Sequence, residues 1–294
     1  MHFLFWFILY PLSVLPLFLL YGIAVILYLV LSYIIGYRRK VIDENLRISF
    51  PEKNKKEIRQ IRREYYWHLS QIAAEMLKMI TISREALKRR YHCQNPELVN
   101  QYFDQGRSVI LMSSHYNNWE WMVLSLDSQF KHHGVGVGKA NSNKNFEKLI
   151  NRARTRYGTE VVFADTVKNV FEKYESQHIP TCYMMLSDQS PGNPHRCYVT
   201  DFLKHRSGMI YGAEHYARKY NLPVVYYQVI KDRMGYYHLE LELITDKPLE
   251  ETEGFITKRY VQLLENTIQS HPAHWLWSHR RWKHHFNNKN QYIP

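Results

Sequence analysis

The chain has 294 residues, of which 45% are hydrophobic and 15% aromatic, and its 39 Lys and Arg against 27 Asp and Glu leave a net charge of +12. This length and composition argue against extensive disorder and predict one large folded domain, or one domain with an appendage. The positive charge favours an anionic partner: nucleic acid, an anionic membrane or a phosphorylated substrate. The three cysteines form no CxxC pair, which argues against a disulfide framework and is typical of a reducing compartment.

The N-terminus is apolar. Residues 3–37 include no Asp, Glu, Lys or Arg, and this run exceeds the ~20 residues that a membrane-spanning helix needs. Arg38, Arg39 and Lys40 follow the run, whereas a signal peptide carries its basic residues in front of a shorter core. We therefore predict an uncleaved membrane anchor over residues 1–37 and a main domain over residues 38–294. The positive-inside rule places residues 38 onward in the cytoplasm, and Pro11 and Pro16 are expected to kink or divide the anchor.

The rest of the chain reads as alternating helices and strands. Apolar residues from Ile58 to Ile80 recur at helical spacing between Lys and Arg, which indicates an amphipathic helix that lies near the membrane surface or has an ordinary solvated face. The predicted strands are Val109–Ser113, Val135–Lys139, Glu160–Phe163, Thr181–Leu186, Val224–Ile230 and Tyr237–Leu243. The predicted helices are Trp119–Phe130, Asn145–Tyr157, Thr166–Ser176, Gly208–Tyr220 and Phe255–His271. This alternation predicts an α/β fold with a central sheet.

The stretch SSHYNNWEW follows the first of these strands and carries the main candidates for chemistry. Asn117 or Asn118 is expected to cap the next helix, which leaves Glu120 in its first turn, where a carboxylate is favoured in its ionised form. Across the loop, Glu120 can meet His115, fix its tautomer and raise its basicity. With no Gly-x-Ser-x-Gly elbow in the sequence, the expected nucleophile is a hydroxyl of the substrate, with His115 as its general base. The alternative is a structural histidine.

The histidines near the C-terminus, between His271 and His285, do not form a recognisable set of metal ligands. The neighbouring Arg280, Arg281 and Lys283 would repel a cation, so we predict no metal site. The tryptophans among them are expected to form a patch at the level of the lipid headgroups, or a groove for an anionic glycolipid. The stretch GVGVGK at 134–139 lacks the spacing of a phosphate loop and is interpreted as a strand.

Several motifs together resemble one family. At the end of a predicted strand, His115 is followed after four residues by the acidic Glu120. This pattern resembles the motif of the glycerolipid and lysophospholipid acyltransferase superfamily. The stretches NLRISFPEKN, INRARTRYG, LSDQSPG and HPAHWLWSHRRWK resemble its lipid A biosynthesis branch, the lauroyl/myristoyl acyltransferases, over nearly the whole chain. The resemblance implies a central mixed sheet flanked by helices behind an N-terminal anchoring helix, located at the inner membrane with the acyltransferase domain facing the cytoplasm.

The resemblance also implies a reaction and roles for residues. An acyl chain would move from acyl carrier protein or coenzyme A to a hydroxyl of an anionic lipid acceptor, with no cofactor. His115 would be the general base and Glu120 would orient it. Asn118, Asp188 and Gln189 would bind substrate, as would Arg152, with Arg154 as its rival, because a guanidinium binds phosphate in a bidentate manner.

The acceptor stays open at this point. A lipid A precursor is the leading expectation, and another lysolipid, aminolipid or glycolipid is the alternative within the same chemistry. A non-catalytic lipid-binding protein of the same fold is the alternative outside it. A nucleic-acid binder is disfavoured, because the sequence contains no recognisable binding module.

Overall fold

The computed structural model describes residues 5–140, 143–287 and 289–293, so residues 1–4 of the predicted anchor lie outside it. Its α-helices are α2 Tyr10–Val14, α3 Leu17–Leu29, α4 Arg39–Ser49, α5 Lys55–Lys78, α6 Arg84–Arg90, α7 Glu97–Asp104, α8 Trp119–Gln129, α9 Lys144–Arg154, α10 Val167–Ser176, α11 Gly212–Tyr220 and α12 Phe255–Ser270. Its strands are β1 Tyr91–Cys93, β2 Val109–Ser113, β3 His133–Gly138, β4 Glu160–Phe163, β5 Thr181–Leu186, β6 Tyr198–Phe202, β7 His205–Met209, β8 Val224–Arg233, β9 Tyr236–Thr245, β10 His285–Phe286 and β11 Tyr292–Ile293. Two π-helical turns, η1 Phe5–Leu9 and η2 Val30–Ile35, and a 3₁₀ turn, η3 Pro272–His274, complete the described elements.

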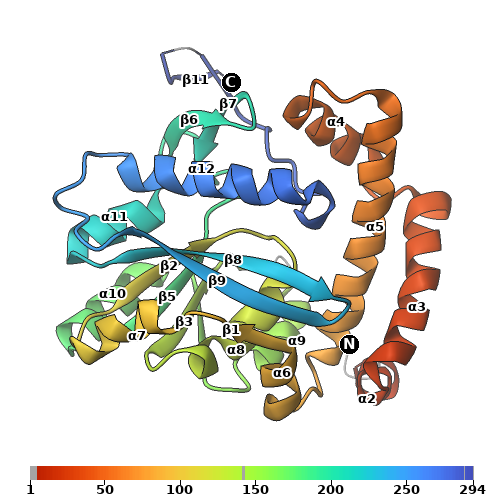
Figure 1. Ribbon diagram of the computed structural model, residues 1–294, viewed down its shortest axis with the longest axis horizontal. Helices are drawn as coiled ribbons and strands as arrows, with labels where there is room; N and C mark the ends of the chain where they lie inside the picture. The colour runs from red at the N-terminus through yellow and green to blue at the C-terminus, as the bar shows by residue number, and fades with distance from the viewer. Residues whose placement is uncertain (1–4, 141–142, 288, 294) are drawn as a thin grey trace.

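A seven-stranded sheet in the order β1-β9-β8-β2-β5-β3-β4 occupies the centre (Figure 1). The β8–β9 hairpin is antiparallel and the other neighbouring pairs are parallel. This arrangement confirms the predicted α/β class with a mixed sheet. All five residues of β2 are buried, because Ile110 and Met112 face one hydrophobic core while Val109 and Leu111 face the other.

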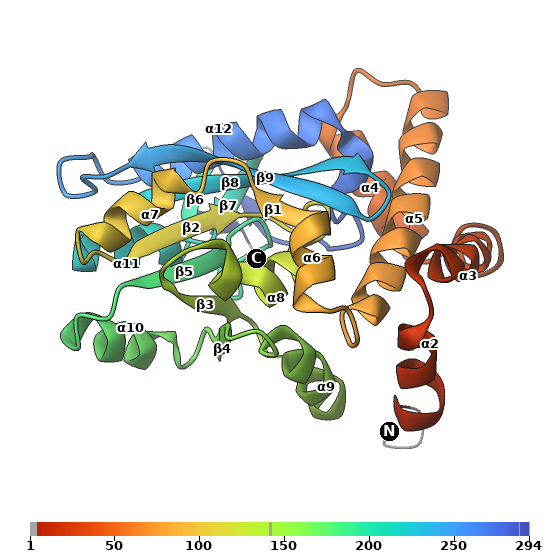
Figure 2. The ribbon, with the colours of Figure 1, turned by 60° about the horizontal axis from the view of Figure 1, so that its bottom comes forward.

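Helices cover both faces of the sheet. Side chains of α10, α11 and α12 pack into the core that contains Ile110, and side chains of α6, α7 and α8 pack into the core that contains Leu111. Figure 1 shows α12 on one side of the strands and α6, α7 and α8 on the other. Helix α5 stands across one end of the sheet and has α3 beside it in both ribbon views (Figure 2).

The predicted elements agree with the structure with one substantial exception. The strands predicted over residues 109–113, 160–163 and 181–186 coincide with β2, β4 and β5. The helix predicted from Gly208 is wrong at its start, because residues 205–209 form β7, which pairs with β6 in a hairpin. A Cβ on Gly208 would lie 2.8 Å from Cys197 Sγ and 2.8 Å from a ring carbon of Phe286, so the glycine is required by strand packing rather than by a helix start.

The N-terminal apolar run forms a helix that is long enough to cross a membrane. Within the described residues it is the one such helix, Leu17–Ile35, with 19 residues. One face of it packs along α5 through the buried Leu17, Leu20 and Ala24. Helix α5 begins at an Asn54–Glu57 capping box, in which each side chain binds the backbone of the other.

The glycines of β3 predict a measurable difference in packing. A Cβ on Gly134 would lie 2.9 Å from the backbone nitrogen of Asp127 in α8, whereas a Cβ on Gly138 would have no atom within 4 Å. We expect Gly134→Ala to lower the free energy of unfolding by about 1–3 kcal/mol because it overpacks the helix–sheet contact. Gly138→Ala, the matched control, should change it by less than about 1 kcal/mol. Urea denaturation in detergent measures both, and equal losses would contradict this account of the contact.

Candidate active site

The candidate site lies where two neighbouring parallel strands end. Strands β2 and β5 pair in register, with Ser113 opposite Leu186, and the Ser187 amide donates to the Ser113 carbonyl at 3.1 Å. His115 and Asp188 each follow their strand end by two residues, so the register brings them to the same level. The carboxyl ends of parallel strands are the usual place for binding sites in open α/β sheets.

Two asparagines shape the loop between β2 and α8. Asn117 adopts a left-handed conformation with φ of 52°, which asparagine tolerates better than most residues, and its amide donates to the Val229 carbonyl at 2.7 Å. Asn118 caps α8 by accepting a hydrogen bond from the Trp121 amide at 2.9 Å. Its side-chain NH₂ donates to buried Glu75 at 2.6 Å. Asn118 is 0% exposed, so it shapes the loop and does not line the cavity as a substrate-binding residue.

The Asp188 carboxylate is the hydrogen-bond partner of His115. Asp188 Oδ1 lies 2.8 Å from His115 Nδ1, and Oδ2 accepts from the His115 backbone amide at 3.0 Å and from Trp275 Nε1 at 2.8 Å. Burial would raise the pKa of Asp188, but the charge of His115 and these hydrogen bonds outweigh it and hold the pKa below its usual value. The group is therefore an ionised acceptor at neutral pH.

This geometry selects one tautomer of His115. An ionised Asp188 accepts a hydrogen bond from Nδ1–H, so the proton stays on Nδ1 and the lone pair is on Nε2. The side-chain amide of Gln189 lies 3.2 Å from Nε2 and can donate to it. The His115 side chain is 20% exposed and lines a cavity of about 970 Å³, which is described below. Nε2 is therefore placed to accept a proton from a bound hydroxyl.

Glu120 does not have the place that the sequence predicted for it. Its two carboxylate oxygens accept from Arg154, at 2.7 Å from Nε and 2.6 Å from Nη2, in a bidentate ion pair. Trp119 connects this pair to the histidine: its indole N–H donates to Glu120 at 3.1 Å and its ring centroid lies 5.3 Å from that of His115. The expectation that Glu120 orients His115 is therefore corrected, because Asp188 occupies Nδ1 and Glu120 holds Arg154.

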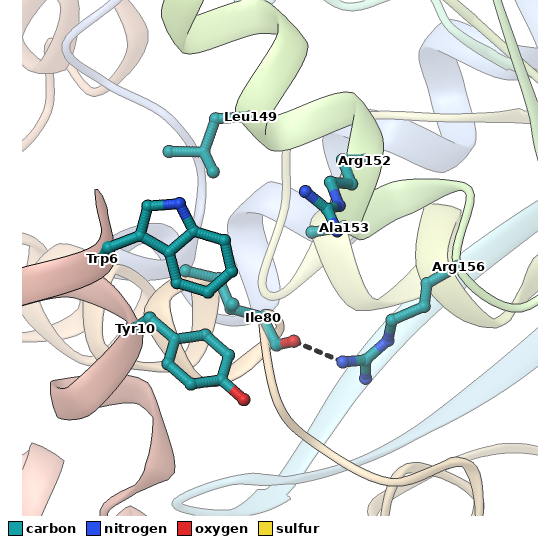
Figure 3. Close-up of a pocket in the computed structure, with 7 residues that line it drawn as sticks. All are labelled: Trp6, Tyr10, Ile80, Leu149, Arg152, Ala153 and Arg156. Atoms are coloured by element: carbon teal, nitrogen blue, oxygen red, sulfur yellow. Dashed lines mark hydrogen bonds between the residues drawn. The ribbon is translucent and has the colours of Figure 1, made fainter. Parts of the chain in front are cut away.

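The two rival arginines lie in different places. Arg154 lines the same cavity as His115. Burial would lower its pKa, but the hydrogen bonds and charge of Glu120 raise it above the usual value, so the guanidinium stays charged. Arg152 lines a separate pocket of about 270 Å³ beside Trp6, Tyr10 and Leu149 (Figure 3). The helix turns these two side chains in different directions, so Arg154, the rival, lines the cavity of His115 and Arg152 does not.

The cavity at His115 has a volume of about 970 Å³ and wraps around the carboxyl ends of β3, β4 and β5. Its lining combines apolar side chains with cations. The apolar members include Val123, Val137, Val167, Met184 and Leu186, and the cationic members are Lys139, Arg154, Arg196 and Lys283. Such a cavity suits a molecule with a hydrocarbon part and an anionic part.

The C-terminal tryptophans belong to the core and not to a headgroup-level patch. Trp275, Trp277 and Trp282 are at most 7% exposed, and Arg281 is 2% exposed, with a hydrogen bond to the Gly208 carbonyl at 2.9 Å. Segment 274–276 pairs with the loop at His115: Leu276 N donates to the His115 carbonyl and Asn117 N donates to the His274 carbonyl.

No group of three His, Cys, Asp or Glu placed to hold a metal occurs in the described part of the chain.

Two functional contacts were missed from the sequence: Asp188 as the partner of His115, and Trp275 as the donor to Asp188. A signal for the first was present, because Asp188 follows its predicted strand by the same two residues as His115 follows its own. Strand pairing and register were needed to use it. No local pattern in the sequence indicated the second, because Trp275 lies 87 residues from Asp188 along the chain.

Trp275 allows a test of the buried carboxylate. Trp275→Phe removes one donor, and we expect the free energy of unfolding at pH 7 to fall by about 1.5–3 kcal/mol. The lowered pKa of Asp188 means that the hydrogen bonds stabilise its ionised form, so this loss is full above the unfolded value of 3.8 and shrinks as the pH falls through the folded pKa. Denaturation at pH 7 and at acid pH measures it. Trp282→Phe, which removes a neutral bond to Ser207 Oγ of 2.9 Å, should show no such pH dependence, and equal profiles would contradict the assignment.

Comparison with known proteins identifies the family of the chain. The family model for bacterial lipid A biosynthesis acyltransferases matches residues 1–284. No match was found among curated proteins. The chain therefore belongs to the bacterial lipid A biosynthesis acyltransferase family, and it is an acyltransferase.

Proposed function

We propose that this protein transfers a fatty acyl chain from an acyl thioester to a hydroxyl of a lipid A precursor of the Kdo-lipid A type. The observation that carries the proposal is the His115–Asp188 pair, which directs the Nε2 lone pair of the histidine into a cavity with both apolar and cationic walls. The family gives the reaction class, acyl transfer. The catalytic and binding roles proposed below are argued from the contacts of the residues that line the cavity.

The proposed reaction is a direct acyl transfer. His115 Nε2 takes the proton of the acceptor hydroxyl as its oxygen attacks the thioester carbonyl carbon. The carbon–sulfur bond then breaks, an ester forms, and the imidazolium returns the proton to the thiolate that leaves. Asp188 stays ionised throughout and stabilises the imidazolium, as a buried carboxylate does in other base-assisted acyl transfers. Gln189 releases Nε2 when the hydroxyl takes its place.

Arg154 is the proposed contact for the anionic part of a substrate. Glu120 uses both oxygens to hold the guanidinium at the cavity wall, and the Arg154 side chain remains 25% exposed. Lys139, Arg196 and Lys283 add positive charge to the same cavity. A phosphate on the acceptor, or on the carrier of the acyl chain, fits this charge.

The donor and the location are parts of the same proposal. Acyl carrier protein or coenzyme A would bring the acyl thioester, and no cofactor would be needed. The N-terminal apolar helix would anchor residues 38–294 to the inner membrane, on its cytoplasmic face, where the basic residues 38–40 favour that side. Both the acyl chain and the acceptor can then reach the cavity from lipid.

The decisive experiment compares lipids from cells that lack the protein and cells that carry the wild type, His115→Gln or Asp188→Asn. We expect one acyl chain of lipid A to be lost and to be restored by the wild type alone, as measured by mass spectrometry. In vitro, removal of the base should lower kcat by about 10²–10⁴-fold, and Asp188→Asn by a comparable factor because the tautomer is no longer held.

Other outcomes separate the alternatives. Unchanged lipid A together with an accumulating lysolipid, aminolipid or glycolipid would keep the chemistry and change the acceptor. No change in any lipid would favour a non-catalytic lipid-binding protein. Full activity of His115→Gln, with the variant folded and membrane-bound, would exclude the proposed base.

The two arginines provide a matched test. Arg154→Lys keeps the charge but loses the bidentate bond to Glu120, and we expect kcat/KM for the acyl acceptor to fall about 10-fold or more. Arg152→Lys, made on the same helix, leaves the Glu120 pair intact and should change kcat/KM by less than about 3-fold. The reverse ranking would move the anion contact back to Arg152.

A further inference from the structure

The N-terminal segment, residues 5–37, has one outward face that is apolar and exposed. We call these residues the anchor segment. Phe18, Ile26 and Ile34 are 70%, 63% and 76% exposed. The remaining members of this face include Val14 and Ile35. An apolar face of this kind requires a partner, and the length of the apolar helix, 19 residues from Leu17 to Ile35, indicates lipid.

The inward face is bound to α5 along its length. At the carboxyl end, Tyr66 Oη donates to the Tyr37 carbonyl at 2.8 Å, and in the middle Tyr21 Oη donates to Glu75 at 2.7 Å. At the amino end, Lys78 Nζ donates to the carbonyls of Ser13 and Leu15, both at 3.0 Å. The anchor segment therefore runs antiparallel to α5 and contacts it at both ends.

A hairpin turn and two charged side chains lie against the anchor segment on the side that faces the protein. The turn of the β8–β9 hairpin lies against it, since a Cβ on Gly235 would lie 2.8 Å from Leu17 Cδ2. Arg90 donates to the Gly235 carbonyl at 3.3 Å. If α3 crossed the hydrocarbon region in this position, the hairpin turn, Arg90 and Lys78 would enter it too. Charges and open turns are strongly disfavoured at that depth, so lipid is expected only on the outward face.

The amino end of the anchor segment lies next to α9, in the main domain of the protein. Trp6 and Tyr10 line the pocket of about 270 Å³ together with Leu149 and Arg152 of α9, and Arg156, bound to the Ile80 carbonyl, is a further lining residue (Figure 3). Tryptophan, tyrosine and arginine gather at the level of lipid headgroups. In a transmembrane arrangement this end would lie across the bilayer from α9, whereas here the two are neighbours.

We propose that the anchor segment lies in the plane of the membrane, enters a single leaflet and has both ends on the same side. Its partner is one leaflet of an anionic bilayer, whose lipid phosphates meet Arg152; Arg156 is held by the Ile80 and Ile82 carbonyls. A helix of sufficient length to span therefore acts as a monotopic anchor, because its inner face is already occupied by the protein. This inference does not depend on the acyl acceptor or on the catalytic residues.

The test is the topology of the full-length protein. One protease-cleavable tag precedes Met1, another follows Pro294, and both are probed in right-side-out and inverted inner-membrane vesicles. We expect both tags to be cut in the inverted vesicles and both to be protected in the others. Cutting in opposite vesicle types would show a span and overturn the proposal. Cutting of both in right-side-out vesicles would keep the in-plane anchor and overturn only the cytoplasmic location.

Depth measurements supply an independent readout that the tags cannot disturb. The variants Phe18→Cys, Ile26→Cys and Ile34→Cys, each made after replacement of the native cysteines, carry a nitroxide in nanodiscs with anionic lipid. An in-plane anchor places all three at a similar depth of about 5–10 Å. A deep Ile26 between shallow Phe18 and Ile34 would overturn the proposal. Leu249→Cys, at a 58% exposed residue after β9, is the aqueous reference.

Discussion

One buried carboxylate joins the three segments from which the site is built. Asp188 follows β5, its hydrogen bonds fix both the ring and the backbone of His115 after β2, and its third donor is Trp275 near the C-terminus. With 2% exposure it obtains no useful hydration, so these three donors must satisfy it. The position of the histidine, its tautomer and the attachment of the C-terminal segment to the loop all depend on this group.

A second buried carboxylate, Glu75, joins the same loop to the N-terminal helix. It accepts from Asn118, Tyr21 and Tyr237, which belong to the cap of α8, to α3 and to β9. Burial raises the pKa of Glu75 despite these bonds, whereas the nearby His115 charge makes Asp188 more acidic than usual. The loop of His115 is thus held between two acidic side chains, Asp188 next to the imidazole and Glu75 next to the apolar N-terminal helix. The apolar N-terminal helix and the loop of His115 are therefore connected through hydrogen bonds to a single buried side chain.

The placement of charge explains why an acidic residue near a histidine need not be its partner. Glu120 lies close to His115 in sequence, but Arg154 offers it two parallel hydrogen bonds and a permanent countercharge, so the pair forms with Arg154. The pair fixes a cation at the wall of an apolar cavity, which is the combination that recognition of an anionic lipid requires. Trp119 contacts both groups and keeps their relative position.

The sequence by itself determined those features that depend on neighbours along the chain. Hydrophobic runs and periodicity predicted β2, β4, β5, the apolar anchor and the α/β class, and the asparagine cap of α8 was predicted as one of two candidates. Local patterns also made His115 the candidate base, which stays a prediction, and motif resemblance predicted the family, which the family model confirms. Tertiary structure decided the contacts across the chain: the partner of His115, the burial of Trp275, Trp277 and Trp282, the separation of Arg152 from Arg154, and the replacement of a helix start by β7. The physical reason is that strand register and core packing join residues tens of positions apart, and neither leaves a periodic signal in the local sequence.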